Sequence, residues 1–160
     1  MKSKPVKRAA SQSGSGGSAD SVSDSVYWSG GHSKHRLLFH LVFIPKYRRR
    51  VLEGALAARV RFLLEQASEV KGWRLHELSI QPDHVHVHVH VLLQVHPRES
   101  VASVVQTLKG GSSRILHQEF SDLEEFIWDD SFWSVGYFAE SIGQREEKAV
   151  RRYIVNQREI

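Results

Sequence analysis

The hydrophobic positions at the start of the ordered chain change from a continuous run to a helical period. The apolar run from Leu37 to Ile44, interrupted only by His40, predicts a buried strand that Pro45 ends. The next apolar side chains follow spacings of four, three, one and three, which place them on one face of a helix: Leu56, Val60, Leu63, Leu64 and Ala67. We therefore expect a strand followed by a helix that ends at Gly72.

The middle of the chain predicts two more strands joined by a turn. We expect the first from Trp73 to Gln81, and Pro82-Asp83 is a turn signal. The segment from His84 to Val95 then has the clearest alternation in the chain. Because successive side chains of a strand face opposite ways, its valines can pack a core. The other face carries four imidazoles: His84, His86, His88 and His90.

The last third of the chain predicts a helix, a strand and a second helix. Ser100 is expected to cap a helix that Gly110-Gly111 interrupts. A strand is expected from about Ser134 to Ser141, and a final helix from roughly Glu146 to Gln157. The order strand, helix, strand, strand, helix, strand, helix predicts an α+β fold, with an antiparallel sheet covered by helices.

The amino-acid composition divides the chain into a polar N-terminal segment and a single domain. Residues 1–32 are rich in Ser and Gly, so we expect a disordered tail or linker, with order beginning near Arg36. The chain of 160 residues has no cysteine, which excludes disulfides and thiolate metal sites. Its net charge of +4 suits a nucleic-acid partner. No apolar run approaches the roughly 20 residues that span a bilayer, so we expect a cytoplasmic protein without a membrane partner.

The histidine face of the alternating segment is a candidate metal site. Two imidazoles two residues apart on a strand point the same way and can share one ion, for which neutral imidazole is a common ligand. A solvated strand face is the alternative, and an accidental expansion of the His-Val dipeptide is another. Four histidines in register on a strand with an apolar back favour the metal site.

The final helix brings a phenol and an amide together. Glu146, Val150, Tyr153, Ile154 and Gln157 lie on one stripe of this helix. Tyr153 and Gln157 stand four residues apart, so their polar groups can reach the same point. The alternative is an amphipathic helix with a polar end.

Five motifs in order resemble the HUH-type, single-tyrosine transposases (the TnpA type) of the bacterial insertion-sequence 200/605 group. The resemblance runs from about Leu37 to Gln157. Its motifs are the strand and basic turn at Phe39 to Arg50, Gln81-Pro82-Asp83-His84-Val85-His86, Leu108-Lys109-Gly110-Gly111-Ser112-Ser113, Phe132-Trp133 followed by Gly136-Tyr137-Phe138 and Gly143, and Tyr153-Ile154-Val155-Asn156-Gln157. Each motif alone is weak evidence for the resemblance, but five motifs in the family's order are strong evidence.

The resemblance implies a fold and a reaction. Residues 33–160 would form one HUH catalytic domain with a ferredoxin-like sheet. Such enzymes bind single-stranded DNA hairpins at transposon ends as homodimers, in which the active sites can be shared between subunits. Here Tyr153 would attack the DNA and form a 5′-phosphotyrosine link. His84, His86 and Gln157 would hold Mg²⁺ or Mn²⁺, which polarises the scissile phosphate. The location would be cytoplasmic and nucleoid-associated.

The sequence carries four more strand residues than the family pattern, which leaves two histidine pairs open. Read forward from the turn, the pair is His84 and His86, which we favour because the turn anchors the register; read backward from Leu92, it is His88 and His90. An even insertion keeps the pairs on one face. The extra residues also leave open a relative that is inactive or domesticated and only binds DNA hairpins.

Further polar residues are candidates for contact with DNA, and two tyrosines rival Tyr153. Phosphate contacts are expected from Lys46, Arg48, Arg49, Arg50, Lys109, Ser112, Ser113 and Arg152. Tyr47 and Tyr137 are rival nucleophiles, but neither has a glutamine four residues on. We expect Tyr137 to pack in the core.

Overall fold

The computed structural model describes residues 27–46, 54–82, 87–120 and 131–156. Its elements follow the predicted order, preceded by a short hairpin. They are β1 (Trp28–Ser29), β2 (Lys34–His35), β3 (Leu37–Phe43), α1 (Gly54–Lys71), β4 (Arg74–Pro82), β5 (Val87–Val95), α2 (Val101–Glu119), β6 (Phe138–Ser141) and α4 (Glu147–Asn156). No helix in these ranges has the length and apolar character needed to cross a bilayer.

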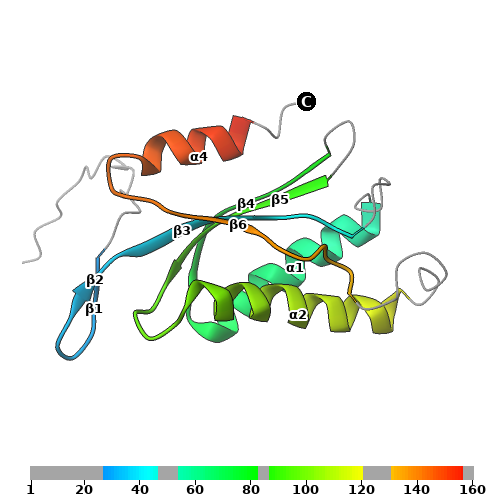
Figure 1. The fold of residues 1–160 in the computed structure, drawn as a ribbon, viewed down its shortest axis with the longest axis horizontal. Coiled ribbons are helices and arrows are strands. Elements are labelled where there is room, and N and C mark those ends of the chain that lie inside the picture. Colours follow the sequence, from blue (N-terminus) through cyan, green and yellow to red (C-terminus); the bar gives the residue numbers. More distant parts are fainter. Residues whose placement is uncertain (1–26, 47–53, 83–86, 121–130, 157–160) are drawn as a thin grey trace, which may run out of the picture.

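A four-stranded antiparallel sheet in the order β4-β5-β3-β6 forms the centre of the molecule. Helices α1 and α2 cover one face of this sheet, and α4 is the described helix that covers the other (Figure 1). The histidine strand β5 lies between β3 and β4, so both of its edges are paired. The predicted α+β fold with helices covering an antiparallel sheet is confirmed.

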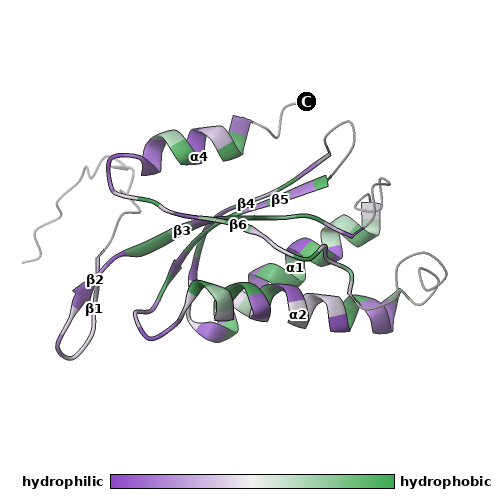
Figure 2. Ribbon diagram, in the orientation of Figure 1, coloured by the Kyte–Doolittle hydropathy of each residue, from purple (hydrophilic) through white to green (hydrophobic). Residues whose placement is uncertain are grey.

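The two faces of the sheet bury cores of very different size. The face toward α1 and α2 buries the main core, to which β5 contributes the alternate residues Val87, Val89, Val91, Leu93 and Val95, as predicted. The face toward α4 buries a small cluster of Leu38, Leu92, Ile142 and Ile154. Figure 2 shows hydrophobic residues where α1 and α2 meet the sheet, whereas α4 carries hydrophilic residues along much of its length. The main core therefore holds the domain together, while α4 has few apolar contacts.

Helix α2 begins as predicted but does not stop at its glycines. The side chain of Ser100 accepts a hydrogen bond from the backbone N–H of Ser103, which caps the helix. The expected interruption at Gly110-Gly111 is wrong, because α2 continues to Glu119. Both glycines are exposed, while Leu108 and Leu116 are anchored in the main core on either side of them. That packing offsets a propensity cost of about 1 kcal/mol for each glycine.

Strands are present before Arg36, the residue near which order was expected to begin. Strands β1 and β2 pair through Trp28 opposite His35 and Ser29 opposite Lys34. The Trp28 ring also lies 4.8 Å, centroid to centroid, from the His96 ring at the end of β5. This ring contact joins positions far apart in the chain, so the Ser/Gly-rich composition gave no sign of it.

The last strand is shorter than predicted. β6 covers Phe138–Ser141 and pairs with β3, whereas Trp133 forms only an isolated bridge with Pro45. Between them Gly136 has a φ of 94°, a left-handed conformation that disfavours a continuous strand. The segment expected as one strand from Ser134 therefore turns before it joins the sheet edge.

Candidate active site beneath the terminal helix

A cavity of about 480 Å³ lies between α4 and the sheet. Its lining includes His40 and Val42 from β3, His90 from β5, Phe138 and Glu140 from β6, and Val150 and Tyr153 from α4. Strand alternation explains this set, because Leu38, His40 and Val42 share one face of β3 while Leu41 and Phe43 turn to the main core. The site thus collects side chains from three adjacent strands and one helix.

Two buried imidazoles form the floor of this cavity. Nε2 of His40 lies 3.1 Å from Nδ1 of His90, a hydrogen-bond distance, and the two rings stack with centroids 5.4 Å apart. His40 is 7% exposed and His90 is 6% exposed. Since one nitrogen must donate and the other accept, the contact requires a proton on only one of these two nitrogens.

Burial keeps both rings neutral. It lowers the pKa of His90 to about 4, with smaller contributions from the charges of His40 and His88. Burial likewise lowers the pKa of His40, partly offset by the Glu140 carboxylate. Glu140 is the direct partner of His40 across β3 and β6. Neutral imidazoles can accept a proton or bind a metal ion at neutral pH.

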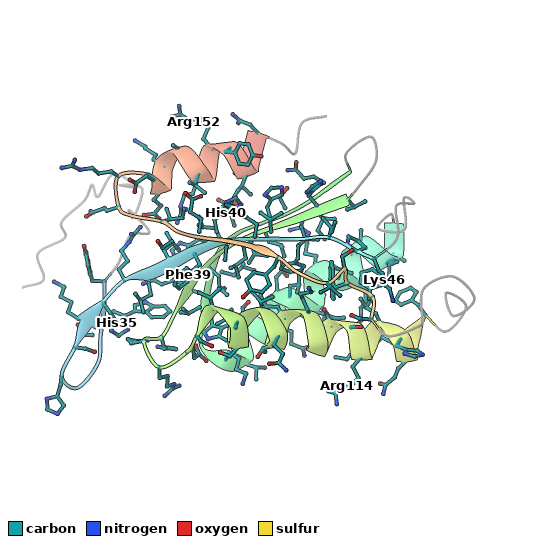
Figure 3. The ribbon with its side chains drawn as sticks, viewed as in Figure 1. His35, Phe39, His40, Lys46, Arg114 and Arg152 are labelled. Atoms are coloured by element: carbon teal, nitrogen blue, oxygen red, sulfur yellow. The ribbon has the colours of Figure 1, made fainter. Side chains whose placement is uncertain are left out.

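Tyr153 lies over this histidine pair. Its ring centroid is 5.9 Å from that of His90 and 6.5 Å from that of His40, with both contacts edge-on. Figure 3 shows His40 between the sheet and α4. Tyr153 is 52% exposed, so its phenol is accessible from outside the cavity. The predicted nucleophile is therefore placed beside imidazoles and within reach of a large substrate.

The described residues provide some, but not all, of the ligands that a metal ion would need. His88 and His90 share a face of β5 with ring centroids 6.1 Å apart, and neutral imidazole is a suitable donor. Among the residues that the structure describes, no three His, Asp or Glu side chains converge closely enough to hold an ion. The predicted ligands His84, His86 and Gln157 lie outside the described residues.

The Lys-Gly-Gly-Ser-Ser segment makes contacts within the protein. Lys109 Nζ donates to the carbonyl oxygens of Ser134 and Gly136, at 2.7 and 2.9 Å. The Ser112 hydroxyl accepts from Trp133 Nε1 at 2.9 Å, and the Ser113 hydroxyl accepts from the backbone N–H of Phe132 at 3.0 Å. These three side chains hold residues 132–136, and Ser112 is only 4% exposed. Their contact with DNA stays a prediction, and no described contact of theirs requires it.

The other predicted DNA contacts lie at separate places. Arg152 is exposed on α4 and points away from the sheet (Figure 3). Lys46 is half-buried beyond β3, where its backbone N–H donates to Phe132 O at 2.9 Å. Arg48, Arg49 and Arg50 lie outside the described residues. Of this set the structure therefore describes only Lys46 and Arg152, which lie on different elements.

Sequence reasoning missed some site residues and misplaced another. His40 had a signal, because it is the one polar side chain in the apolar run of β3. Glu140 and Phe138 had none, since only strand order brings β6 beside β3. The expectation that Tyr137 packs in the core is wrong, because it is 45% exposed just before the edge strand. Its rival Tyr47 lies outside the described residues.

Comparison with known proteins gives the same family over the whole described domain. The family model described as "Transposase IS200 like" matches residues 33–157. The transposase for insertion sequence element IS200 of Salmonella typhimurium is 34% identical over 128 residues, which cover 80% of this chain and 81% of that protein. The ISDra2 transposase TnpA of Deinococcus radiodurans is 28% identical over 123 residues, or 77% of this chain and 85% of that protein.

Solved structures agree with the sequence comparison. A putative transposase from Deinococcus radiodurans has a TM-score of 0.64 and 27% identity, covering 81% of this chain and 97% of its own. A REP-associated tyrosine transposase bound to a REP hairpin has a TM-score of 0.51 over 79% of this chain and 70% of its own. At 9% identity this second likeness concerns the fold alone. With a family model that spans nearly the entire domain and a curated relative at 34% identity, the chain belongs to the IS200-like family of single-tyrosine transposases.

Proposed function

We propose that this protein is a single-strand DNA transposase that binds hairpins at transposon ends, cuts DNA with Tyr153 and rejoins the strands. The observation that carries the proposal is the Tyr153 ring, half-exposed and edge-on to the buried His40–His90 pair. An exposed phenol beside neutral imidazoles suits attack on a large substrate. The family membership adds that the substrate is DNA. Such an enzyme would act in the cytoplasm, at the nucleoid.

The proposed step is an exchange of one phosphate ester for another. The Tyr153 oxygen forms a bond to phosphorus, and the bond from phosphorus to the 3′-oxygen breaks. The phenol loses one proton and the released 3′-hydroxyl gains one. The product is a 5′-phosphotyrosine link, which divides a difficult strand exchange into two easier steps. Because the ester bond is conserved, rejoining needs no nucleotide cofactor.

A divalent ion, Mg²⁺ or Mn²⁺, would supply electrostatic stabilisation of the scissile phosphate when bound. The contact of Tyr153 with His90, whose neighbour on the same face is His88, favours these two histidines as its ligands over His84 and His86, with Gln157 as the proposed third ligand. Nδ1 of His90 faces His40, so a proton on that nitrogen would leave Nε2 of His90 free to bind. His40 would then accept from His90 and fix the orientation of its ring.

The proposal is tested by trapping the covalent intermediate. The purified protein is mixed with a labelled single-stranded hairpin and Mn²⁺, and adducts are resolved on a denaturing gel. Tyr153→Phe should abolish the adduct, because it removes only the attacking oxygen. Tyr137→Phe is the matched control and should retain it, since Tyr137 lies outside the cavity lining. A full yield of adduct from Tyr153→Phe would refute the assignment.

The same assay tests the alternative of a relative that only binds DNA hairpins. The His-Val residues beyond the family pattern are the observation behind this alternative, because they move one histidine pair along β5. A binding-only protein would retain the hairpin in a gel shift without metal and yield no adduct in its unmodified form. Adduct formation by the unmodified protein excludes it.

Paired alanine variants identify the histidines. His88→Ala with His90→Ala should abolish both the adduct and Mn²⁺ binding measured by calorimetry. His84→Ala with His86→Ala should leave both largely unchanged. The reverse result would assign the ion to the pair nearest the Pro82-Asp83 turn.

A homodimer is part of the proposal. β6 forms one edge of the four-stranded sheet, and all four of its residues are exposed, so a second chain can approach it. Light scattering should give twice the chain mass. Mixing the Tyr153→Phe and His90→Ala proteins tests sharing of active sites. Restored adduct formation would mean that tyrosine and histidine come from different subunits, and no restoration would mean that each chain completes its own site.

A further inference from the structure

The helix that carries Tyr153 is tied to the sheet by a chain of buried and part-buried charged and polar groups. Arg36, between β2 and β3, forms an ion pair with Glu147, the first residue of α4. Glu147 also accepts from Arg151 Nε at 3.2 Å, and Arg151 donates to Nδ1 of His76 at 2.5 Å. His76 Nε2 then lies 3.0 Å from Gln94 Oε1. This set of five residues, here called the α4 clamp, crosses β4 and β5 and reaches the start of β3.

The clamp requires one protonation state of His76. A guanidinium has donors and no acceptor, so Nδ1 of His76 must accept from Arg151. Nε2 then carries the proton and donates to the amide oxygen of Gln94. Burial lowers the pKa of His76, which agrees with a neutral ring. Every bond in the clamp therefore has one direction, and the five side chains hold each other in a single arrangement.

A β-bulge presents His76 to the helix. The register of β4 against β5 shifts between Leu75 and Glu77, which leaves His76 as the extra residue. Residues three apart on a regular strand face opposite sides of the sheet. Leu75 and Leu78 nevertheless both pack on the main core, because the extra residue His76 shifts the alternation by one position. Bulges cost regular ladder pairing and re-aim side chains. Here the re-aimed side chain is the one that contacts α4.

The clamp and the nucleophile lie on opposite flanks of α4. Glu147, Val150 and Ile154 follow the stripe that faces the sheet, with spacings of three and four. Arg151 extends from one side of that stripe toward β4, and Tyr153 extends from the other toward His40 on β3. Fixing one flank therefore fixes how far the helix can roll about its axis.

Within the described residues, few other contacts restrain this roll: besides the ring contacts of Tyr153, Gln81 Nε2 donates to Ile154 O at 3.4 Å. The apolar contacts of α4 are Ile154 and the partly buried Val150, in a cluster separate from the main core. A side-chain tip lies about 6 Å from a helix axis, so a roll of about 10° moves it by about 1 Å. A displacement of that size at a reacting group can lower a rate by about 100-fold. A loose helix would keep its fold and still misplace the phenol.

We propose that Glu147, Arg36, Arg151 and His76 are positioning residues, which hold the Tyr153 phenol in register with the His40–His90 pair. The inference rests on the proposed function, because it concerns the attack by Tyr153. It predicts that the clamp governs the rate of the covalent step and leaves hairpin binding alone.

The main test is Glu147→Gln, which keeps the shape of the side chain and removes its charge. The single-turnover rate of adduct formation with Mn²⁺ should fall about 10- to 100-fold, while the dissociation constant for the hairpin changes less than about twofold. Amide hydrogen exchange of residues 147–156 without metal should accelerate. Arg36→Gln should reproduce the defect if Glu147→Gln does not fold. Arg36→Lys should retain most of the rate, since only one Arg36 nitrogen contacts Glu147.

The matched control is another ion pair between elements. Arg59 on α1 and Glu119 on α2 form two hydrogen bonds of 2.7 and 2.6 Å on the opposite side of the sheet. Arg59→Gln should change neither the adduct rate nor exchange in α4. Normal adduct formation and exchange in Glu147→Gln would overturn the inference while the proposed function stands. Absence of adduct from the unmodified protein would instead reject the proposed function, and hydrogen exchange would still decide whether the clamp holds α4.

Discussion

Replacing Ser112 by alanine should destabilise the domain without lowering its affinity for a DNA hairpin. The Ser112 hydroxyl accepts from the buried Trp133 indole, and the two residues are 4% and 2% exposed. Alanine would leave that N–H without its partner, a loss of about 1–3 kcal/mol. The better helix propensity of alanine offsets about 0.5 kcal/mol of this. We expect a net decrease of about 1–2 kcal/mol in the free energy of unfolding.

Urea unfolding of the metal-free protein measures this decrease, and a thermal melt should show a midpoint lowered by about 3–8 °C. Thr107→Ala is the control on the same helix. Its hydroxyl donates to Ser103 O at 2.9 Å and satisfies no buried donor, so its loss should change stability by less than about 0.5 kcal/mol. Hairpin affinity and its salt dependence should stay unchanged in Ser112→Ala. An unaltered stability together with weaker, less salt-dependent binding would mean that Ser112 contacts DNA, and would refute the reasoning.

Three further predictions concern pH, metal and the start of α2. Burial lowers the pKa of His90 from 6.5 to about 4, so between these values the unfolded chain binds the extra proton. The contribution of neutral His90 to the free energy of unfolding is therefore complete above about pH 6.5 and is lost as the pH falls toward about 4. Urea unfolding at pH 7 and at pH 4.5 should show a smaller decrease in this free energy for His90→Gln than for the unmodified protein. An equal decrease in both proteins would contradict the assignment. Excess EDTA should abolish the adduct and spare hairpin binding in a gel shift, whereas persistent adduct would exclude metal dependence. Ser100→Ala should lower the free energy of unfolding by about 1 kcal/mol, through loss of the bond to Ser103 N–H, and leave the adduct rate unchanged.

Local periodicity was sufficient to predict the order of the elements from β3 onward, but not the β1–β2 hairpin. The alternating valines of β5 predicted its buried face, because burial on a strand repeats every two residues. The helical stripe around Leu63 predicted α1 in the same way. Composition was a poorer guide, since α2 passes through Gly110-Gly111 where packing on either side outweighs local propensity.

The contacts that build the site could not be predicted from the sequence. His40 and His90 are 50 residues apart, and Arg36 and Glu147 are 111 apart, so both pairs depend on strand order and helix placement. The bulge that presents His76 has no sequence signature here. Motifs predicted candidate side chains but not what those side chains contact within the protein. The expected contact of Lys109 with phosphate stays a prediction, whereas its hydrogen bonds to two backbone carbonyls had no signal in the motif.

The central claim is that the phenol beside the buried histidine pair is the one that joins DNA. Its most direct test is to digest the trapped protein–DNA adduct and to identify the nucleotide-bearing peptide by mass spectrometry. The account predicts a phosphodiester on Tyr153 alone. Attachment to Tyr47, Tyr137 or any other side chain would contradict it.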